Sequence, residues 1–176
     1  MNSNSFELDV VQIRLVKNAP LYSNEKITSA EKAVEIIGEE LSDMDREVVA
    51  VVNCRNDLTP INVNFVSMGT LDRALFSPKD ILKSAILSNA STIVLVHNHP
   101  SGKTTPSIAD VCVTEKMEEL CDLIGITLAD HVIVGGADKD NYFSFSKNGL
   151  LNGTPNVAYV AENDIEYEGQ VQQRGR

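Results

Sequence analysis

An apolar run that ends in two closely spaced histidines is the most constraining feature of this chain. Residues 91–96, Ser-Thr-Ile-Val-Leu-Val, predict a buried strand, and residues 97–102, His-Asn-His-Pro-Ser-Gly, follow it directly. Side chains two apart on a strand point the same way, so His97 and His99 can reach one point in space. Asp110 follows at the predicted start of a helix. Two imidazoles and one carboxylate are the ligand set of a catalytic zinc site, which keeps its fourth position open for water.

The rest of the chain alternates strand and helix patterns. Strands are predicted over residues 9–17, 47–53, 59–68, 91–97, 126–134 and 141–146. Helices are predicted over residues 29–43, 77–89 and 107–123. Ser77 is the expected N-cap of the second helix and Pro78 its first residue. Because a hairpin precedes the first buried crossover, we predict one domain of mixed α/β class, a mixed β-sheet flanked by helices.

Composition excludes several classes of function. The 176 residues carry a formal net charge of −10, and a field of that sign disfavours a nucleic-acid partner. No apolar stretch approaches the ~20 residues of a membrane span, and the N-terminus lacks the features of a signal peptide. The chain has 3 cysteines and no Cys-x-x-Cys pair, which argues against disulfides and against a cysteine zinc site. We therefore expect a cytoplasmic protein with no membrane partner.

Other interpretations of the histidine segment stay open at this point. A His-x-His pair can pack or hydrogen-bond without any metal. Ser107 and Asp110 form a Ser-x-x-Asp pattern that is typical of a capping box. Capping and metal binding can coexist, since the helix dipole also keeps a carboxylate in the first turn ionised. Two histidines and a carboxylate are also the facial triad of non-haem Fe(II) oxygenases, but three helical segments disfavour the all-β fold of those enzymes.

Three further polar residues call for an interpretation. Asn98 lies between the two histidines, so it should point away from the ligands and have a structural role. Asp130 and His131 could orient a ligand imidazole. We favour the alternative that they form a hydrogen-bonded pair at a strand edge.

Several motifs, in order along the chain, resemble a known family. Residues 97–102 and 106–110 (Pro-Ser-Ile-Ala-Asp) resemble the JAMM signature H-x-H-x7-S-x2-D of the JAB/MPN metalloprotease family, in the form of its RadC branch. Residues 130–135 (Asp-His-Val-Ile-Val-Gly) and 142–145 (Tyr-Phe-Ser-Phe) resemble two further stretches of that branch. The similarity covers about residues 28–150.

The resemblance implies a JAB/MPN-like three-layer fold and zinc-dependent cleavage of a peptide or isopeptide bond. His97, His99 and Asp110 would hold one Zn²⁺ per chain, and Ser107 would hydrogen-bond the oxyanion. Glu47 matches the family's acidic general base by its place before an early strand. Without the resemblance, Glu47 reads as an exposed carboxylate at a strand end.

The chain divides into three expected segments. Residues 1–27 form an N-terminal strand extension, residues 28–152 the JAB/MPN (RadC-like) metallohydrolase domain, and residues 153–176 a flexible acidic tail. The first segment is too short for the helix-hairpin-helix module that precedes the RadC domain. Its strand over residues 9–17 can pair with a second copy to give a homo-oligomer. The alternative function is a catalytically silent RadC-like binding module associated with DNA repair or mobile elements.

Overall fold

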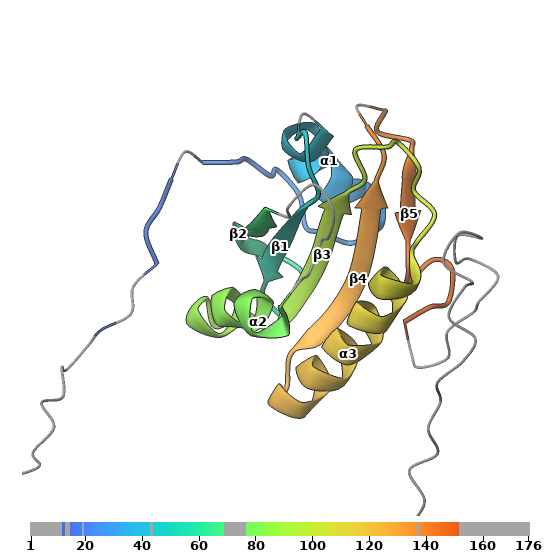
Figure 1. Cartoon of the computed structure of the whole chain (residues 1–176). Helices are drawn as coiled ribbons and strands as arrows, with labels where there is room; N and C mark the ends of the chain where they lie inside the picture. Colours follow the sequence, from blue (N-terminus) through green and yellow to red (C-terminus); the bar gives the residue numbers. More distant parts are fainter. Residues whose placement is uncertain are drawn as a thin grey trace, which may run out of the picture.

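A mixed sheet between two helical layers forms the body of the molecule (Figure 1). The computed structural model describes residues 12, 15–18, 20–42, 44–68, 77–136 and 138–151. The helices are α1 (Ala30–Ser42), α2 (Pro78–Leu87) and α3 (Ile108–Ile124). The strands are β1 (Val48–Cys54), β2 (Pro60–Met68), β3 (Thr92–Asn98), β4 (Thr127–Val134) and β5 (Tyr142–Ser144).

The strands are arranged in the order β2-β1-β3-β4-β5. β1 pairs antiparallel with both β2 and β3, and β5 pairs antiparallel with β4. Among the described strands, only β3 and β4 pair in parallel. Helix α3 connects them and returns the chain to the edge of the sheet where β3 begins. The predicted mixed α/β class with a mixed, helix-flanked sheet is confirmed.

The two faces of the sheet are covered by different helices. Helix α1 packs on one face, against a cluster that includes Ala50, Val94 and Val96. Helices α2 and α3 pack on the other, against a cluster that includes Ile93 and Leu95. Every residue of β1 and β3 is buried, which explains why these strands read as continuous apolar runs rather than alternating ones. The result is the three-layer arrangement expected of a JAB/MPN-like fold.

This layering decides which way the end of β3 faces. Side chains alternate along a strand, so His97 continues the face of Ile93 and Leu95, which α3 covers. Asn98 belongs to the opposite face, on the side of α1. The amino end of α3 therefore comes to lie beside His97.

One expectation from the sequence does not hold among the described residues, and another holds without one of its usual contacts. Gln12 and residues 15–17 are not in a strand, and the remainder of the predicted strand at 9–17 lies outside the described residues. Ser77 is the N-cap of α2 and Pro78 opens the helix, but the serine side chain makes no capping hydrogen bond. The predicted tail at 153–176 also lies outside the described residues. Among the helices that the structure describes, none is long and apolar enough to cross a membrane.

Candidate metal centre

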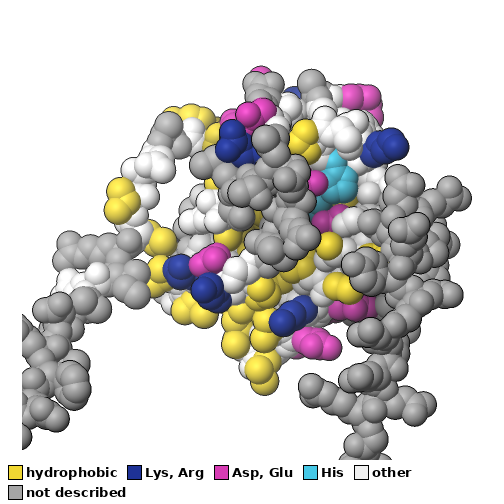
Figure 2. Space-filling model, in the orientation of Figure 1, with side chains coloured by type: hydrophobic (Ala, Val, Ile, Leu, Met, Phe, Trp, Pro, Cys, Tyr) yellow, Lys and Arg dark blue, Asp and Glu magenta, His cyan; other side chains and the backbone are white. Residues whose placement is uncertain are grey.

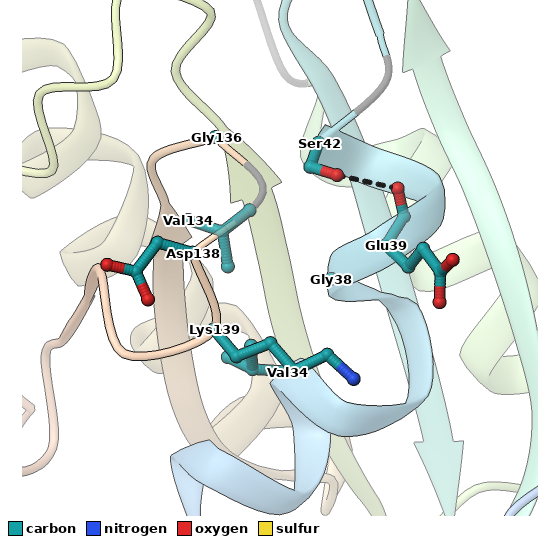
Figure 3. Close-up of a pocket in the computed structure, with 8 residues that line it drawn as sticks. All are labelled: Val34, Gly38, Glu39, Ser42, Val134, Gly136, Asp138 and Lys139. Carbon is teal, nitrogen blue, oxygen red and sulfur yellow. Dashed lines mark hydrogen bonds between the residues drawn. The ribbon is translucent and has the colours of Figure 1, made fainter.

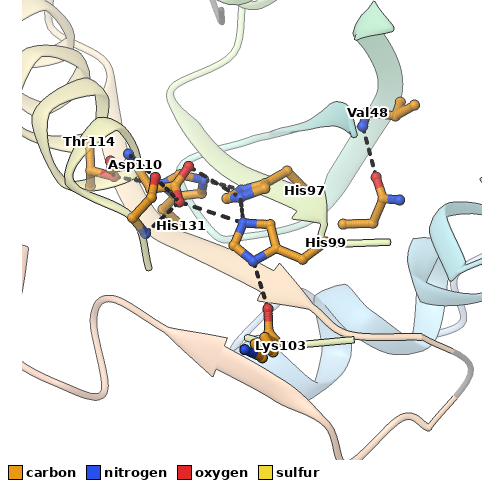
Figure 4. A network of polar contacts seen from close by, with 9 residues as sticks. Val48, His97, His99, Lys103, Asp110, Thr114 and His131 are labelled. Atoms are coloured by element: carbon orange, nitrogen blue, oxygen red, sulfur yellow. Dashed lines mark hydrogen bonds and ion pairs between the residues drawn. The ribbon is translucent and has the colours of Figure 1, made fainter. Parts of the chain in front are cut away.

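Three of the residues singled out in the sequence converge at the carboxyl end of β3 (Figure 4). The Nε2 atoms of His97 and His99 lie 3.0 Å apart. Nε2 of His97 is 3.4 Å from Oδ1 of Asp110, and Nε2 of His99 is 3.5 Å from Oδ2. Zinc bonds of ~2.0–2.1 Å at tetrahedral angles place neighbouring donor atoms about 3.3–3.4 Å apart. The donor set fits a zinc ion with three protein ligands, and the distances from each histidine to one oxygen of Asp110 are near that spacing.

A tight turn returns the chain from β3 toward α3. The N–H of Gly102 donates to the carbonyl of His99 at 2.9 Å, and Gly102 has a φ of 76°. Glycine adopts a positive φ of this kind without the steric cost that a Cβ atom adds. Nδ1 of His99 lies 2.6 Å from the carbonyl oxygen of Lys103, so the turn also holds the ring with Nε2 toward the other ligands.

The loop after β3 is pressed against the end of β4. Nδ2 of Asn141 donates to the carbonyl of Gly102 at 3.0 Å and to that of Gly135 at 2.5 Å. A Cβ atom at Gly135 would lie only 2.5 Å from the Gly102 oxygen and 2.8 Å from Cγ2 of Thr104. Gly135 is therefore required for this close approach, and it closes the Asp-His-Val-Ile-Val-Gly motif noted in the sequence.

Ser107 and Asp110 form the capping box that the sequence predicted. The Ser107 hydroxyl accepts from the Asp110 N–H at 3.2 Å, and Oδ2 of Asp110 accepts from the Ser107 N–H at 2.8 Å. The Ser107 hydroxyl also donates to Oδ2 at 2.7 Å. Oδ1 is left facing His97, so the two interpretations of Asp110 are compatible in one geometry.

The third histidine contacts the first. Nε2 of His131 lies 2.8 Å from Nδ1 of His97, and Nδ1 of His131 lies 2.6 Å from Oγ1 of Thr114. Asp130 bonds the backbone N–H of His131, not its ring, and its other oxygen accepts from the hydroxyl of Ser144 at 2.6 Å. The favoured prediction of a hydrogen-bonded pair is confirmed only for the backbone of His131, and its place at a strand edge is wrong, because β4 lies between β3 and β5.

Thr114 was missed in the sequence because its contact with His131 depends on how α3 packs on β4. The available signal was its position four residues after Asp110, on the same side of the predicted helix.

Glu47 is brought to the site by strand pairing. Val49 of β1 pairs with His97 of β3, and continuing this antiparallel direction beyond the paired residues brings Glu47 toward His99. The two groups are near enough that each charge shifts the pKa of the other. Oδ1 of Asn98 accepts from the N–H of Val48 at 2.7 Å, and its Nδ2 donates to the carbonyl of Arg46 at 3.0 Å. Asn98 thus binds the backbone on both sides of Glu47. It does point away from the ligands, as expected, but it also fixes the strand end that carries the carboxylate.

Burial and neighbouring charges set the protonation of the site. Burial lowers the pKa of His97 well below its usual value, and His131 adds to this effect. Burial also opposes a charged His99, but the Asp110 carboxylate outweighs it and raises the pKa of that ring. Burial favours a neutral Asp110, yet the two ligand histidines hold the pKa of its carboxyl far below normal. Burial raises the pKa of Glu47, with Asp110 acting in the same direction and His99 against it.

The centre opens to the surface. His97 and Asp110 are buried, but 12% of the His99 side chain is exposed, and Figure 2 shows histidine at the surface beside acidic side chains. A separate cavity of about 340 Å³ lies between α1 and the segment joining β4 to β5 (Figure 3). Glu39 and Ser42 line it from α1, and Asp138 and Lys139 from the other side. It contains none of the candidate site residues.

Comparison with known proteins identifies the family. The family described as "RadC-like JAB domain" matches residues 27–150. A "UPF0758 protein" of Thermotoga maritima is 39% identical over 127 residues, which are 72% of this chain and 55% of that protein. A "UPF0758 protein" of Streptococcus gordonii is 40% identical over 132 residues, 74% of this chain and 56% of that protein. The chain thus spans about half the length of the curated relatives it matches. On its fold, its motifs and these matches, this chain belongs to the RadC-like JAB domain family.

Proposed function

We propose that this protein is a zinc-dependent hydrolase of the metallopeptidase or isopeptidase type. The observation that carries the proposal is the convergence of His97, His99 and Asp110 near zinc-ligand spacing, with Glu47 just before the neighbouring strand β1 and close enough to affect the pKa of His99. Three protein ligands leave a fourth position for water, which is the pattern of catalytic rather than structural zinc sites.

Glu47 is proposed as the general base and acid of the reaction. Bound zinc supplies a Lewis acid that lets water lose a proton near neutral pH. Glu47 takes that proton and passes it to the amine that leaves when the peptide or isopeptide bond breaks. Its raised pKa brings the carboxyl closer to the working pH, which improves proton transfer in both directions.

Ser107 is proposed to stabilise the oxyanion that develops on the substrate carbonyl. Its hydroxyl is half-buried at the amino end of α3, beside Asp110. In this role it exchanges its hydrogen bond to Oδ2 of Asp110 for one to the oxyanion, while the N–H of Ser107 keeps Oδ2 in place. Losing one oxyanion donor typically costs ~3–4 kcal/mol of transition-state stabilisation.

Metal content of three variants tests the proposal. Wild type and Glu47→Gln should each hold one zinc per chain by elemental analysis, and His97→Ala should hold none. Wild type should then cleave at least one substrate in a screen of peptides and isopeptide-linked conjugates, and Glu47→Gln should not. Protein that binds no zinc when purified without chelator would contradict the catalytic assignment.

The same experiment separates the alternative. A catalytically silent binding module with a link to DNA repair or mobile elements predicts no hydrolysis by wild type in any substrate class. The charge of −10 disfavours binding to nucleic acid. Cys54, Cys112 and Cys121 are free, which supports the proposal of a cytoplasmic location. The substrate is proposed only as a class, a peptide or isopeptide.

A further inference from the structure

The third histidine of the chain lies directly behind a candidate metal ligand. His131 on β4 is fully buried, and its ring stacks on Phe145 with centroids 4.8 Å apart and an interplanar angle of 12°. Its Nε2 faces Nδ1 of His97 at 2.8 Å, and its Nδ1 faces Oγ1 of Thr114 at 2.6 Å. Each ring nitrogen of His131 therefore has a partner at hydrogen-bond distance.

Thr114 fixes the direction of donation in this series of hydrogen bonds. Its Oγ1 lies 2.6 Å from the backbone carbonyl oxygen of Asp110. A carbonyl can only accept, so the single hydroxyl proton of Thr114 is donated to Asp110. With that proton committed, Oγ1 can only accept from His131, and Nδ1 of His131 must carry the proton.

The proton on Nδ1 of His131 determines the state of His97. A neutral imidazole carries one proton, so Nε2 of His131 is an acceptor. It receives the Nδ1–H of His97, so the proton of neutral His97 lies on Nδ1 and Nε2 is an acceptor. That nitrogen is the one that lies 3.4 Å from Oδ1 of Asp110 and 3.0 Å from Nε2 of His99.

We propose that Thr114 and His131 are positioning residues that hold His97 in the neutral tautomer that can bind zinc through Nε2, the nitrogen that faces Asp110 and His99. If these hydrogen bonds ran in the opposite direction, Nε2 of His97 would carry a proton toward Asp110, and zinc would have to displace that proton. This series of hydrogen bonds begins at the backbone of Asp110 and ends at His97, so it couples two candidate ligands of the same site. The inference deepens the proposed zinc site and rests on it. Groups that orient ligand histidines in this way typically change metal affinity 10–100-fold when removed.

Zinc affinity of Thr114 variants tests the proposal. Thr114→Val keeps the shape of the side chain and removes the hydroxyl, while Thr114→Ser keeps the hydroxyl. Competition against a chelator of known affinity should show 10–100-fold weaker zinc binding for Thr114→Val and near-wild-type binding for Thr114→Ser. Thr92→Val is the matched control, since Thr92 is a buried threonine at the opposite end of β3. It should leave zinc affinity unchanged.

Nitrogen-15 NMR of the imidazoles reports the tautomer of each histidine. This pattern would not change if Thr114 had a packing role alone. The chain has 3 histidines, so the metal-free protein gives three ring patterns that single substitutions can assign. In wild type, His97 and His131 should both be Nδ1–H tautomers. In Thr114→Val, both should shift toward the Nε2–H form, and Thr114→Ser should restore the wild-type pattern.

The two measurements distinguish failure of this inference from failure of the proposed function. Wild type that binds zinc no more tightly than Thr114→Val would overturn the inference and leave the metal site standing. A His97 in the Nε2–H form in metal-free wild type would also overturn it. If wild type binds no zinc at all, the proposed function fails, and the tautomers still decide whether the hydrogen bonds run as inferred.

Discussion

The side chain of Asn98 binds the backbone on both sides of Glu47. It accepts from the N–H of Val48 at 2.7 Å and donates to the carbonyl of Arg46 at 3.0 Å. Asn98 also stands between His97 and His99, so one residue links the strand end that carries the proposed base to the strand end that carries two proposed ligands. The position of the proposed base relative to the candidate metal site therefore depends on one buried amide.

Replacing that amide should separate zinc binding from catalysis. Asn98→Ala leaves the N–H of Val48 without its partner, and we expect a loss of about 1–3 kcal/mol in unfolding free energy. The variant should keep its zinc, since no ligand changes, and should lose most of its hydrolytic activity. Denaturant unfolding, elemental analysis and a cleavage assay measure the three quantities. Asn62→Ala, in the amide network at the other end of β1, should reduce stability alone.

Glu47 should destabilise the metal-free protein when it is ionised. Burial raises its pKa in the fold, so the charged form is disfavoured relative to the unfolded chain, where the value is near 4.5. Glu47→Gln should therefore raise the melting temperature of the metal-free protein at pH 8. The gain should shrink as the pH falls through the folded-state pKa and vanish only well below pH 4.5, where the carboxyl is protonated in both states. Thermal unfolding in chelator measures this. A gain that does not change with pH would contradict it, and Glu35→Gln on the exposed face of α1 serves as control.

Zinc affinity should fall as the pH is lowered. The Asp110 carboxylate raises the pKa of His99 above its usual 6.5, and a histidine must lose its proton before it can bind a metal. Below the His99 pKa, affinity should drop by about tenfold per pH unit for one competing proton. His97 should not add a second proton, because its pKa is lowered. Chelator competition between pH 8 and pH 6 measures the slope, and a flat profile would contradict the assignment.

Gly135 should tolerate no side chain. A Cβ atom there would lie 2.5 Å from the Gly102 oxygen, a backbone atom that cannot turn aside. Gly135→Ala should therefore cost about 1–3 kcal/mol of stability, displace the loop after β3 and weaken zinc binding. Gly38→Ala on α1 is the comparison, because its Cβ meets only the side chain of Val34, at 2.9 Å. That variant should leave zinc affinity unchanged.

The parts of the molecule with local signals were predictable from the sequence. Apolar runs over β1 and β3 and helical spacing over α1 to α3 predicted these elements and the mixed sheet. The cluster of candidate ligands was predictable too, because its residues are close in sequence. His97 lies near the end of β3, His99 lies in the turn after it, and Asp110 lies in the first turn of α3. The strand at 9–17 was predicted from alternation alone, and alternation does not provide a pairing partner.

The contacts made by tertiary packing were not predictable. Glu47 reaches His99 only because β1 pairs with β3 in a particular register, and a register cannot be read from either strand alone. His131 contacts His97 because β3 and β4 are parallel neighbours, an arrangement set by the crossover through α3. Family resemblance supplied Glu47, and for His131 the sequence supported the wrong alternative.

The close spacing of the ligands along the chain has an evolutionary consequence. His97, His99 and Asp110 come from one continuous stretch, whereas Glu47 arrives through the pairing of a distant hairpin. Chelation and chemistry can therefore diverge independently within this family. On the proposed function, a relative whose first hairpin shifts its register would keep the three candidate ligands and lose the proposed base. Retention of the histidine signature alone would then mark common ancestry and not hydrolysis, and the hairpin would separate active members of the family from inactive ones.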